Sequence, residues 1–151
     1  MPTHFQGTEA ENRALNAYIK LLRASETVIN TVHRKASDGF TVSQFGVLEA
    51  LYHLGSLSQV DIGKKLLKSG GNITMVIDNL EKEHLVSRNK DPEDRRRVLV
   101  ELTDKGRERI AGLMPLRVEA IVEVMSALSA DDQEVLGRML KTLGLNSNAR
   151  Q

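Results

Sequence analysis

Basic and small polar side chains gather between positions 58 and 103 of this 151-residue sequence. In the segment SGGNITMVIDNL, positions 69–80, apolar residues recur at the spacing of a buried helix face. The opposite face is small, polar and uncharged near its start, which suits hydrogen bonding to base edges in a DNA major groove. Lys65 and Lys68 precede this segment and add positive charge beside it. The DNA-facing residues that we expect here are Ser69, Gly70, Gly71, Asn72, Thr74, Met75 and Asn79.

A second group of charged residues follows at the tip of a predicted β-hairpin. Residues 98–102 alternate apolar with polar or outward positions, as in a half-buried strand, and residues 85–90 supply the partner strand. Between them stand Asp94, Arg95 and Arg96. In an extended segment Asp94 and Arg96 lie on the same side, so that the carboxylate holds the guanidinium in one pose. An arginine aimed in this way suits a narrow minor groove.

Two short helices must present the first of these groups. Ser58 and Asp61 have the spacing of a capping box, which predicts the start of one helix, and Ser69 is predicted to cap the next. Residues 56–57 could add a short third strand to the hairpin. A helix pair followed by such a hairpin is a winged helix-turn-helix, so the sequence predicts a mainly α fold with a small β-wing.

Further helices with apolar faces are predicted on both sides of this segment. Thr8 with Glu11, and Thr41 with Gln44, have capping-box spacing. A small winged helix cannot cover the long helices at the two chain ends. They could pack on their own domain or on a second copy, and we expect a homodimer built from both ends. The predicted helix spans are 8–36, 41–55, 104–128 and 129–144.

Composition limits the class of protein without deciding it. The sequence has 21 basic and 20 acidic side chains and a net charge of +1, so charge alone leaves DNA binding undecided. With 40% hydrophobic and only 3% aromatic residues, the core must be aliphatic. The absence of cysteine excludes disulfides and thiol redox sensing. No stretch suggests a membrane span or a signal peptide, and we expect a cytoplasmic protein.

The sequence offers little support for catalysis or for a cofactor. It contains no nucleophile elbow, Walker loop or paired-carboxylate cleft, so we expect neither an enzyme nor a cofactor-binding protein. No metal site is expected either, because the four histidines fall in separate elements and form no His-x-x-x-His pair. Each polar residue named above also has a plainer interpretation. Asn72 and Thr74 would be solvated helix positions, and Asp94 with Arg96 would be a surface ion pair of little energetic value.

Two segments resemble one family of regulators. The segment DRRRVLVELTDKG, positions 94–106, resembles the wing of MarR-type transcriptional regulators, with Asp-x-Arg followed by Leu-Thr-x-x-Gly. The segment KSGGNITMVIDNLEKEHLV, positions 68–86, is similar to the recognition helix of the same family, particularly of members that respond to quinones, phenols or peroxides. The resemblance covers nearly the whole chain. It implies a single domain over residues 1–151, with dimerisation helices at 8–36 and 104–146 around a winged helix-turn-helix at 41–103.

The resemblance also implies a partner and a form of regulation. Members of the family are commonly dimeric repressors that bind a pseudo-palindromic operator and are released by a small aromatic effector. Their effector pocket suggests five residues of this chain: His33, Phe45, Tyr52, His53 and Met114. Peroxide sensing through a cysteine is excluded. The alternatives are a winged-helix module that binds a protein rather than DNA, and a small enzyme.

Overall fold

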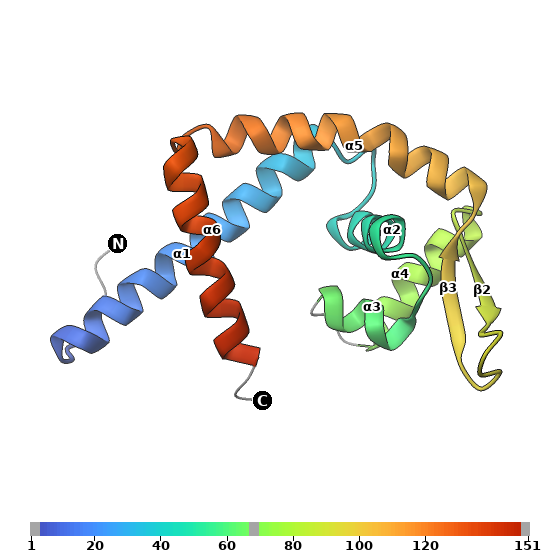
Figure 1. Cartoon of the computed structure of the whole chain (residues 1–151), viewed down its shortest axis with the longest axis horizontal. Coiled ribbons are helices and arrows are strands. Elements are labelled where there is room, and N and C mark those ends of the chain that lie inside the picture. The colour runs from blue at the N-terminus through green and yellow to red at the C-terminus, as the bar shows by residue number, and fades with distance from the viewer. Residues whose placement is uncertain (1–3, 67–69, 149–151) are drawn as a thin grey trace. The chain divides into compact units, whose positions relative to one another are not determined.

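The computed structural model describes residues 4–66 and 70–148. It divides into two compact units, residues 33–118 in one and the two flanking portions of the chain in the other. The predicted fold class is confirmed, because a small antiparallel sheet accompanies a mainly helical chain (Figure 1). The helices are α1 (Glu9–Lys35), α2 (Val42–Leu54), α3 (Gln59–Leu66), α4 (Gly70–Lys82), α5 (Asp104–Met125) and α6 (Ala130–Asn148), and the strands are β1 (Leu57–Ser58), β2 (Val86–Lys90) and β3 (Val98–Leu102).

The three strands form the wing, in the order β1-β3-β2. Both pairings are antiparallel, with Val86 opposite Leu102 at the inner end of the hairpin and Lys90 opposite Val98 at the outer end. Val100 is fully buried, whereas Val98 is 44% exposed. The prediction that Val98, Val100 and Leu102 form the buried face of the strand is therefore wrong at Val98, because the outer end of the hairpin extends past the core that would cover it.

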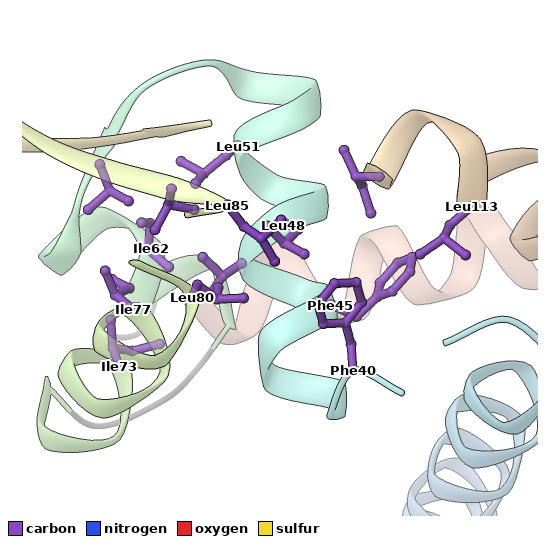
Figure 2. Packing of buried hydrophobic residues seen from close by; sticks show 14 residues of the cluster. Phe40, Phe45, Leu48, Leu51, Ile62, Ile73, Ile77, Leu80, Leu85 and Leu113 are labelled. Atoms are coloured by element: carbon purple, nitrogen blue, oxygen red, sulfur yellow. The ribbon is translucent and has the colours of Figure 1, made fainter. Parts of the chain in front are cut away.

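An aliphatic core lies between α2, α3, α4 and the wing (Figure 2). Helix α4 contributes Ile73, Ile77 and Leu80, each at most 1% exposed. This is the apolar stripe expected from the helical spacing, so the opposite side of α4 faces outward. Other members of the cluster are Phe40, Phe45, Val47, Leu48, Leu51, Ile62, Leu85, Val86, Val100, Ile110 and Leu113.

Side-chain caps begin the helices where the sequence indicated. The capping box of α2 is complete, with Thr41 and Gln44 each bonded to the backbone of the other. At α1, the Thr8 N–H donates to Glu11 Oε2 over 2.7 Å and the Glu11 N–H donates to Thr8 Oγ1 over 3.2 Å. The Thr8 N–H, and the Thr8 hydroxyl that donates to the same Glu11 Oε2 over 3.0 Å, hold the pKa of the Glu11 carboxyl below its usual value. At α3, Ser58 Oγ accepts from the Asp61 N–H over 3.2 Å.

Several predicted boundaries differ from the structure. Helix α6 continues through Gly144, which was predicted to end it, because a glycine inside a helix costs only about 1 kcal/mol and need not adopt a positive φ. Helix α5 ends at Met125, three residues before the predicted end at position 128. Strand β1 begins one residue later than expected. The predicted cap Ser69 lies outside the described residues.

The Leu-Thr-x-x-Gly segment joins the wing to α5. The Thr103 N–H donates to the Leu85 carbonyl over 3.1 Å, and the Thr103 hydroxyl donates to the His84 carbonyl over 2.6 Å. The same hydroxyl accepts from the Gly106 N–H over 3.0 Å, which caps α5. A Cβ on Gly106 would overlap the Leu85 carbonyl oxygen. The motif therefore places the first turn of α5 against the backbone that follows α4.

Replacing Gly106 tests this close approach. Gly106→Ala should destabilise the protein by about 1–3 kcal/mol, because the backbone at Leu85 must move to admit a methyl group. Gly112→Ala is the matched control on the same helix, since a Cβ there meets nothing within 4 Å. The control should be neutral or gain up to about 1 kcal/mol in helix propensity. Thermal unfolding measures both, and equal melting temperatures would contradict the assignment.

Candidate nucleic-acid interface

The outward side of α4 carries the polar residues that the sequence assigned to DNA. Asn72, Thr74, Met75 and Asn79 are all exposed, and Met75 is 59% exposed. Gly70 and Gly71 begin the helix, and Lys65 is exposed on α3. Lys68 and Ser69 lie outside the described residues. Asn72, Thr74, Met75 and Asn79 are thus open to solvent on the helix whose other side contributes Ile73, Ile77 and Leu80 to the core.

The tip of the wing is a hydrogen-bonded turn. Asp94 Oδ1 accepts from the Arg96 N–H over 3.1 Å, and the Asp94 carbonyl accepts from the Arg97 N–H over 2.9 Å. The Asp91 N–H donates to the Arg97 carbonyl over 2.9 Å and closes the loop. The expectation of an extended tip is wrong, because an aspartate readily bonds a backbone N–H two residues on and so favours a turn.

The turn brings Asp94 and Arg96 together in a different way from the one predicted. Arg96 Nε lies 3.7 Å from Asp94 Oδ1, and the Arg96 side chain is 94% exposed. An ion pair this exposed to solvent contributes little free energy. The hydrogen bonds of the turn therefore position the Arg96 backbone more than the ion pair does. Arg95 is also exposed. Arg97 instead points back toward α3, where its Nη2 lies 3.5 Å from Asp61 Oδ2.

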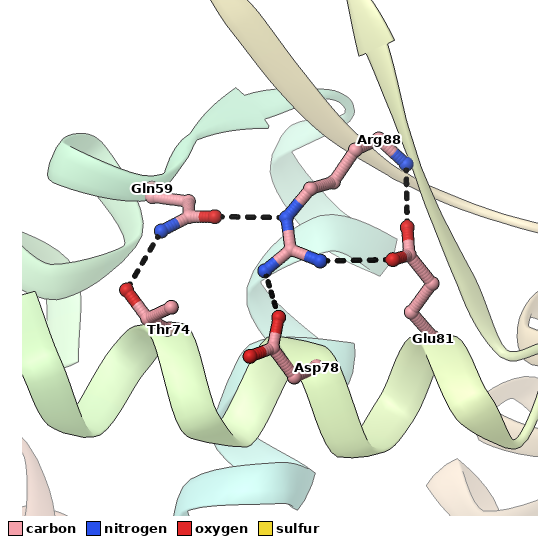
Figure 3. A network of polar contacts seen from close by, with 5 residues as sticks. All are labelled: Gln59, Thr74, Asp78, Glu81 and Arg88. Atoms are coloured by element: carbon pink, nitrogen blue, oxygen red, sulfur yellow. Dashed lines mark hydrogen bonds and ion pairs between the residues drawn. The ribbon is translucent and has the colours of Figure 1, made fainter.

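An ion-pair cluster beside α4 was not anticipated from the sequence. Arg88 of β2 lies 2.6 Å from Asp78 Oδ1 and 3.0 Å from Glu81 Oε1, both on α4 (Figure 3). The two carboxylates are three residues apart and share one side of the helix. The spacing of Asp78 and Glu81 is visible in the sequence and places both carboxylates on one side of a helix. Which residue pairs with them could not be predicted, because that depends on how the wing packs against α4. The guanidinium offsets the negative charge of both carboxylates.

The five proposed effector residues lie in different surroundings. Phe45 is only 1% exposed, Tyr52 and Met114 are half-buried, and His33 is half-buried at the end of α1. His53 is exposed, although its ring meets that of Tyr52 edge-on at 5.2 Å between centroids. Phe45 belongs to the core cluster, and Tyr52 packs against it. The structure therefore brings these two to one region and leaves His53 at the surface.

Arg117 of α5, whose side chain is 16% exposed, adds a cation to that region. Its guanidinium carbon lies 4.0 Å from the centre of the Phe45 ring. Its Nε is 3.7 Å from Glu49 Oε2, which is too long for a hydrogen bond. Within the described residues, neither Nε nor Nη1 has a hydrogen-bond acceptor, although both atoms are buried. Buried donors left in this state cost free energy that a suitable acceptor would recover.

Other kinds of site find no support in the part of the chain that the structure describes. No group of three or more histidine, aspartate or glutamate side chains there could hold a metal ion. No helix among the described residues is long and apolar enough to cross a membrane.

Comparison with known proteins identifies relatives of the whole chain. Residues 40–98 match the MarR family. The chain is 38% identical to the helix-turn-helix transcriptional regulator YkoM of Bacillus subtilis, over 97% of this chain and 96% of the relative. It is 35% identical to the regulator MhqR of the same organism, over 89% and 94% of the two chains. BpsR of Bordetella bronchiseptica, whose DNA binding is regulated by 6-hydroxynicotinic acid, has a structure similar to this one with a TM-score of 0.74, 26% identity and coverage of 95% and 98%.

Proposed function

Because the chain belongs to the MarR family of transcriptional regulators, we propose that it is a homodimeric repressor that a small aromatic ligand releases from DNA. One observation carries the proposal most directly. The exposed polar side of α4 and the exposed arginines of the wing tip project from one compact unit. A helix with such a face fits a major groove, and a thin cationic hairpin fits the neighbouring minor groove.

A role in DNA binding can be proposed for each of the predicted contact residues. Asn72, Thr74, Met75 and Asn79 would contact base edges, and Gly70 and Gly71 would admit a close phosphate near the start of α4. Lys65, Lys68 and Ser69 would contact the DNA backbone. Arg95 and Arg96 would enter the minor groove, with Asp94 shaping the turn. A protein-binding module is less well supported, because this surface is polar and cationic rather than apolar.

Pairing of two chains is supported by the apolar side chains that α1 and α6 leave uncovered. Tyr18 and Leu22 on α1 are 60% and 56% exposed, and Met139 and Leu143 on α6 are 63% and 51% exposed. Apolar surface on this scale marks an interface in soluble proteins. A two-fold dimer would present two wings and two copies of α4, which is how paired helix-turn-helix proteins read palindromic sites.

Arg117 supports an effector that carries a negative charge. The buried Nε and Nη1 atoms lack acceptors among the described residues, and the guanidinium lies over Phe45. A carboxylate or phenolate on an aromatic ring would supply acceptors to these donors and could stack on the same side chains. The regulation of BpsR by 6-hydroxynicotinic acid is consistent with an effector of this class. Without cysteine, release cannot depend on a thiol.

Substitutions at the wing and at α4 should have different effects on DNA binding. Arg96→Ala should weaken binding to all duplexes and flatten the dependence of log affinity on log salt by about one unit. Asn72→Ala should instead relax preference at one operator position, costing roughly 1–3 kcal/mol there. Asp94→Asn keeps an acceptor for the turn and should bind better than Asp94→Ala. Titrations at several salt concentrations measure these differences.

The control for Arg96→Ala is Arg107→Ala, which removes the same charge from an exposed position on α5. It should change the salt dependence less than Arg96→Ala does. If the two variants behaved alike, or if neither changed the salt dependence, the wing would not be a DNA-binding element.

The dimer is tested by placing a charge on the exposed apolar side of α6. Leu143→Glu should leave a single chain folded, since the side chain is 51% exposed, but should shift the protein toward monomer. Lys141→Glu is the control, because Lys141 is exposed and lies about 200° around the helix from Leu143. Sedimentation equilibrium at micromolar concentration measures both. A wild-type monomer, or a Leu143→Glu dimer as tight as the wild type, would rule out this interface.

The effector class is tested with matched pairs of an aromatic acid and its uncharged amide, beginning with 6-hydroxynicotinic acid. The acid should release wild-type protein from DNA at lower concentration than the amide, because only the acid brings a full charge to Arg117. Arg117→Met should remove that difference, whereas Arg107→Met on the same helix should preserve it. Equal potency of acid and amide on the wild type would contradict the proposal, as would release by peroxide that a thiol reductant reverses.

A further inference from the structure

Arg88 lies where the hairpin leaves the core, and it bonds to two helices at once. It is the middle residue of β2, paired across the sheet with the fully buried Val100. Its side chain is only 21% exposed. The guanidinium donates to Asp78 Oδ1 over 2.6 Å, to Glu81 Oε1 over 3.0 Å and, through Nε, to Gln59 Oε1 over 2.9 Å. All three nitrogens of the guanidinium therefore donate a hydrogen bond (Figure 3).

Glu81 binds both the side chain and the backbone of Arg88. Its second oxygen, Oε2, accepts from the Arg88 N–H over 3.2 Å. The carboxylate thus holds the strand itself as well as the guanidinium. Two points of attachment restrict the rotation of β2 relative to α4 more than a single ion pair would. This restricts the direction in which the wing leaves the helix.

Arg88 also determines how the Gln59 amide is oriented. A guanidinium can only donate, so the amide oxygen of Gln59 must face Arg88 and its NH₂ group must face the other way. The Gln59 Nε2 donates to Thr74 Oγ1 over 3.1 Å. A strand residue of the wing is therefore connected, through one amide, to a side chain on the exposed face of α4 (Figure 3).

The three α4 residues in this network follow one line along the helix. Thr74, Asp78 and Glu81 are spaced i, i+4 and i+7, so they lie on the same side over two turns. Contacts at successive turns restrict both the rotation of α4 about its axis and its separation from the wing. The apolar contacts beneath α4 are less directional, because a hydrophobic contact has no preferred angle.

We propose that Arg88 is a positioning residue for DNA reading. It holds the wing and α4 in one relative geometry, and through Gln59 it sets the position of the Thr74 side chain. The helix and the wing then engage the duplex as one unit, with the acids of α4 kept paired while phosphates approach. The proposal rests on the DNA-binding function proposed above.

Arg88→Lys separates geometry from charge. The ammonium keeps the charge but cannot reproduce the planar fork that serves Gln59, Asp78 and Glu81 together. The variant should lose about tenfold in discrimination between a site selected by the wild type from random duplexes and unrelated DNA, which is the value of one good base contact. Its affinity for unrelated DNA and its salt dependence should change little. Lys82→Met is the control, an exposed position at the end of α4, and should keep full discrimination.

Gln59→Met tests the branch to Thr74 by itself. It should relax base preference at the same operator position as Thr74→Val, and the double variant should lose no more than either single one, because the two act through one contact. If Gln59 served stability alone, Gln59→Met would lower the melting temperature, but it would not relax base preference at the same operator position as Thr74→Val. Since Arg88 is not altered, this comparison remains decisive if Arg88→Lys fails to fold.

The possible results distinguish a failure of the proposed DNA-binding function from a failure of the role proposed for Arg88. If wild-type protein selects no preferred duplex, the proposed function fails and the role of Arg88 fails with it. If the wild type is selective but Arg88→Lys discriminates as well, only the role of Arg88 is overturned. The Thr74 branch is overturned if Gln59→Met and Thr74→Val relax different operator positions, or if their losses add.

Discussion

The burial of one aliphatic cluster holds every proposed DNA-binding element of this protein in place. Ile73, Ile77 and Leu80 of α4 are buried together with Leu85 and Val100 of the wing region. Since the sequence is only 3% aromatic, this core depends on close packing of branched aliphatic side chains. Such packing leaves few voids, so α4 and the hairpin cannot shift independently without opening a cavity. The polar face of α4 is turned to solvent because the apolar face of the same helix is packed in this core.

Directional bonds at the edge of this core then set orientation. The Leu85 carbonyl accepts a hydrogen bond from the Thr103 N–H. Gly106 packs closely against the same carbonyl, which fixes the start of α5 beside Leu85. Asp94 closes the turn at the wing tip. Each of these contacts uses a backbone group that the sheet and the helices leave without a regular partner. Packing therefore sets how far apart the elements lie, and the polar contacts set their angles.

Charge is arranged locally rather than in bulk. The net charge of +1 gives the whole chain little attraction to DNA. Around α4 and the wing, however, several acids are paired with arginines of the wing, Asp78 and Glu81 with Arg88 and Asp61 with Arg97. Arg96 at the tip is 94% exposed. Although Arg96 pairs with Asp94 over 3.7 Å, its charge therefore stays accessible to solvent, and the net charge of the sequence does not reveal this arrangement.

Local patterns in the sequence determined the elements and their inner faces. Helical spacing identified the buried side of α4, and the boxes at Thr8 and Thr41 marked where helices begin, because these signals act within a few residues. Gly144 and the wing tip were predicted wrongly, since a glycine may sit inside a helix and an aspartate may favour a turn over an extended chain. Only the tertiary structure decided the partners of Arg88 and Arg117. Gln59 and Arg88 are 29 positions apart, and their meeting depends on how the wing packs against two helices, which no local pattern encodes.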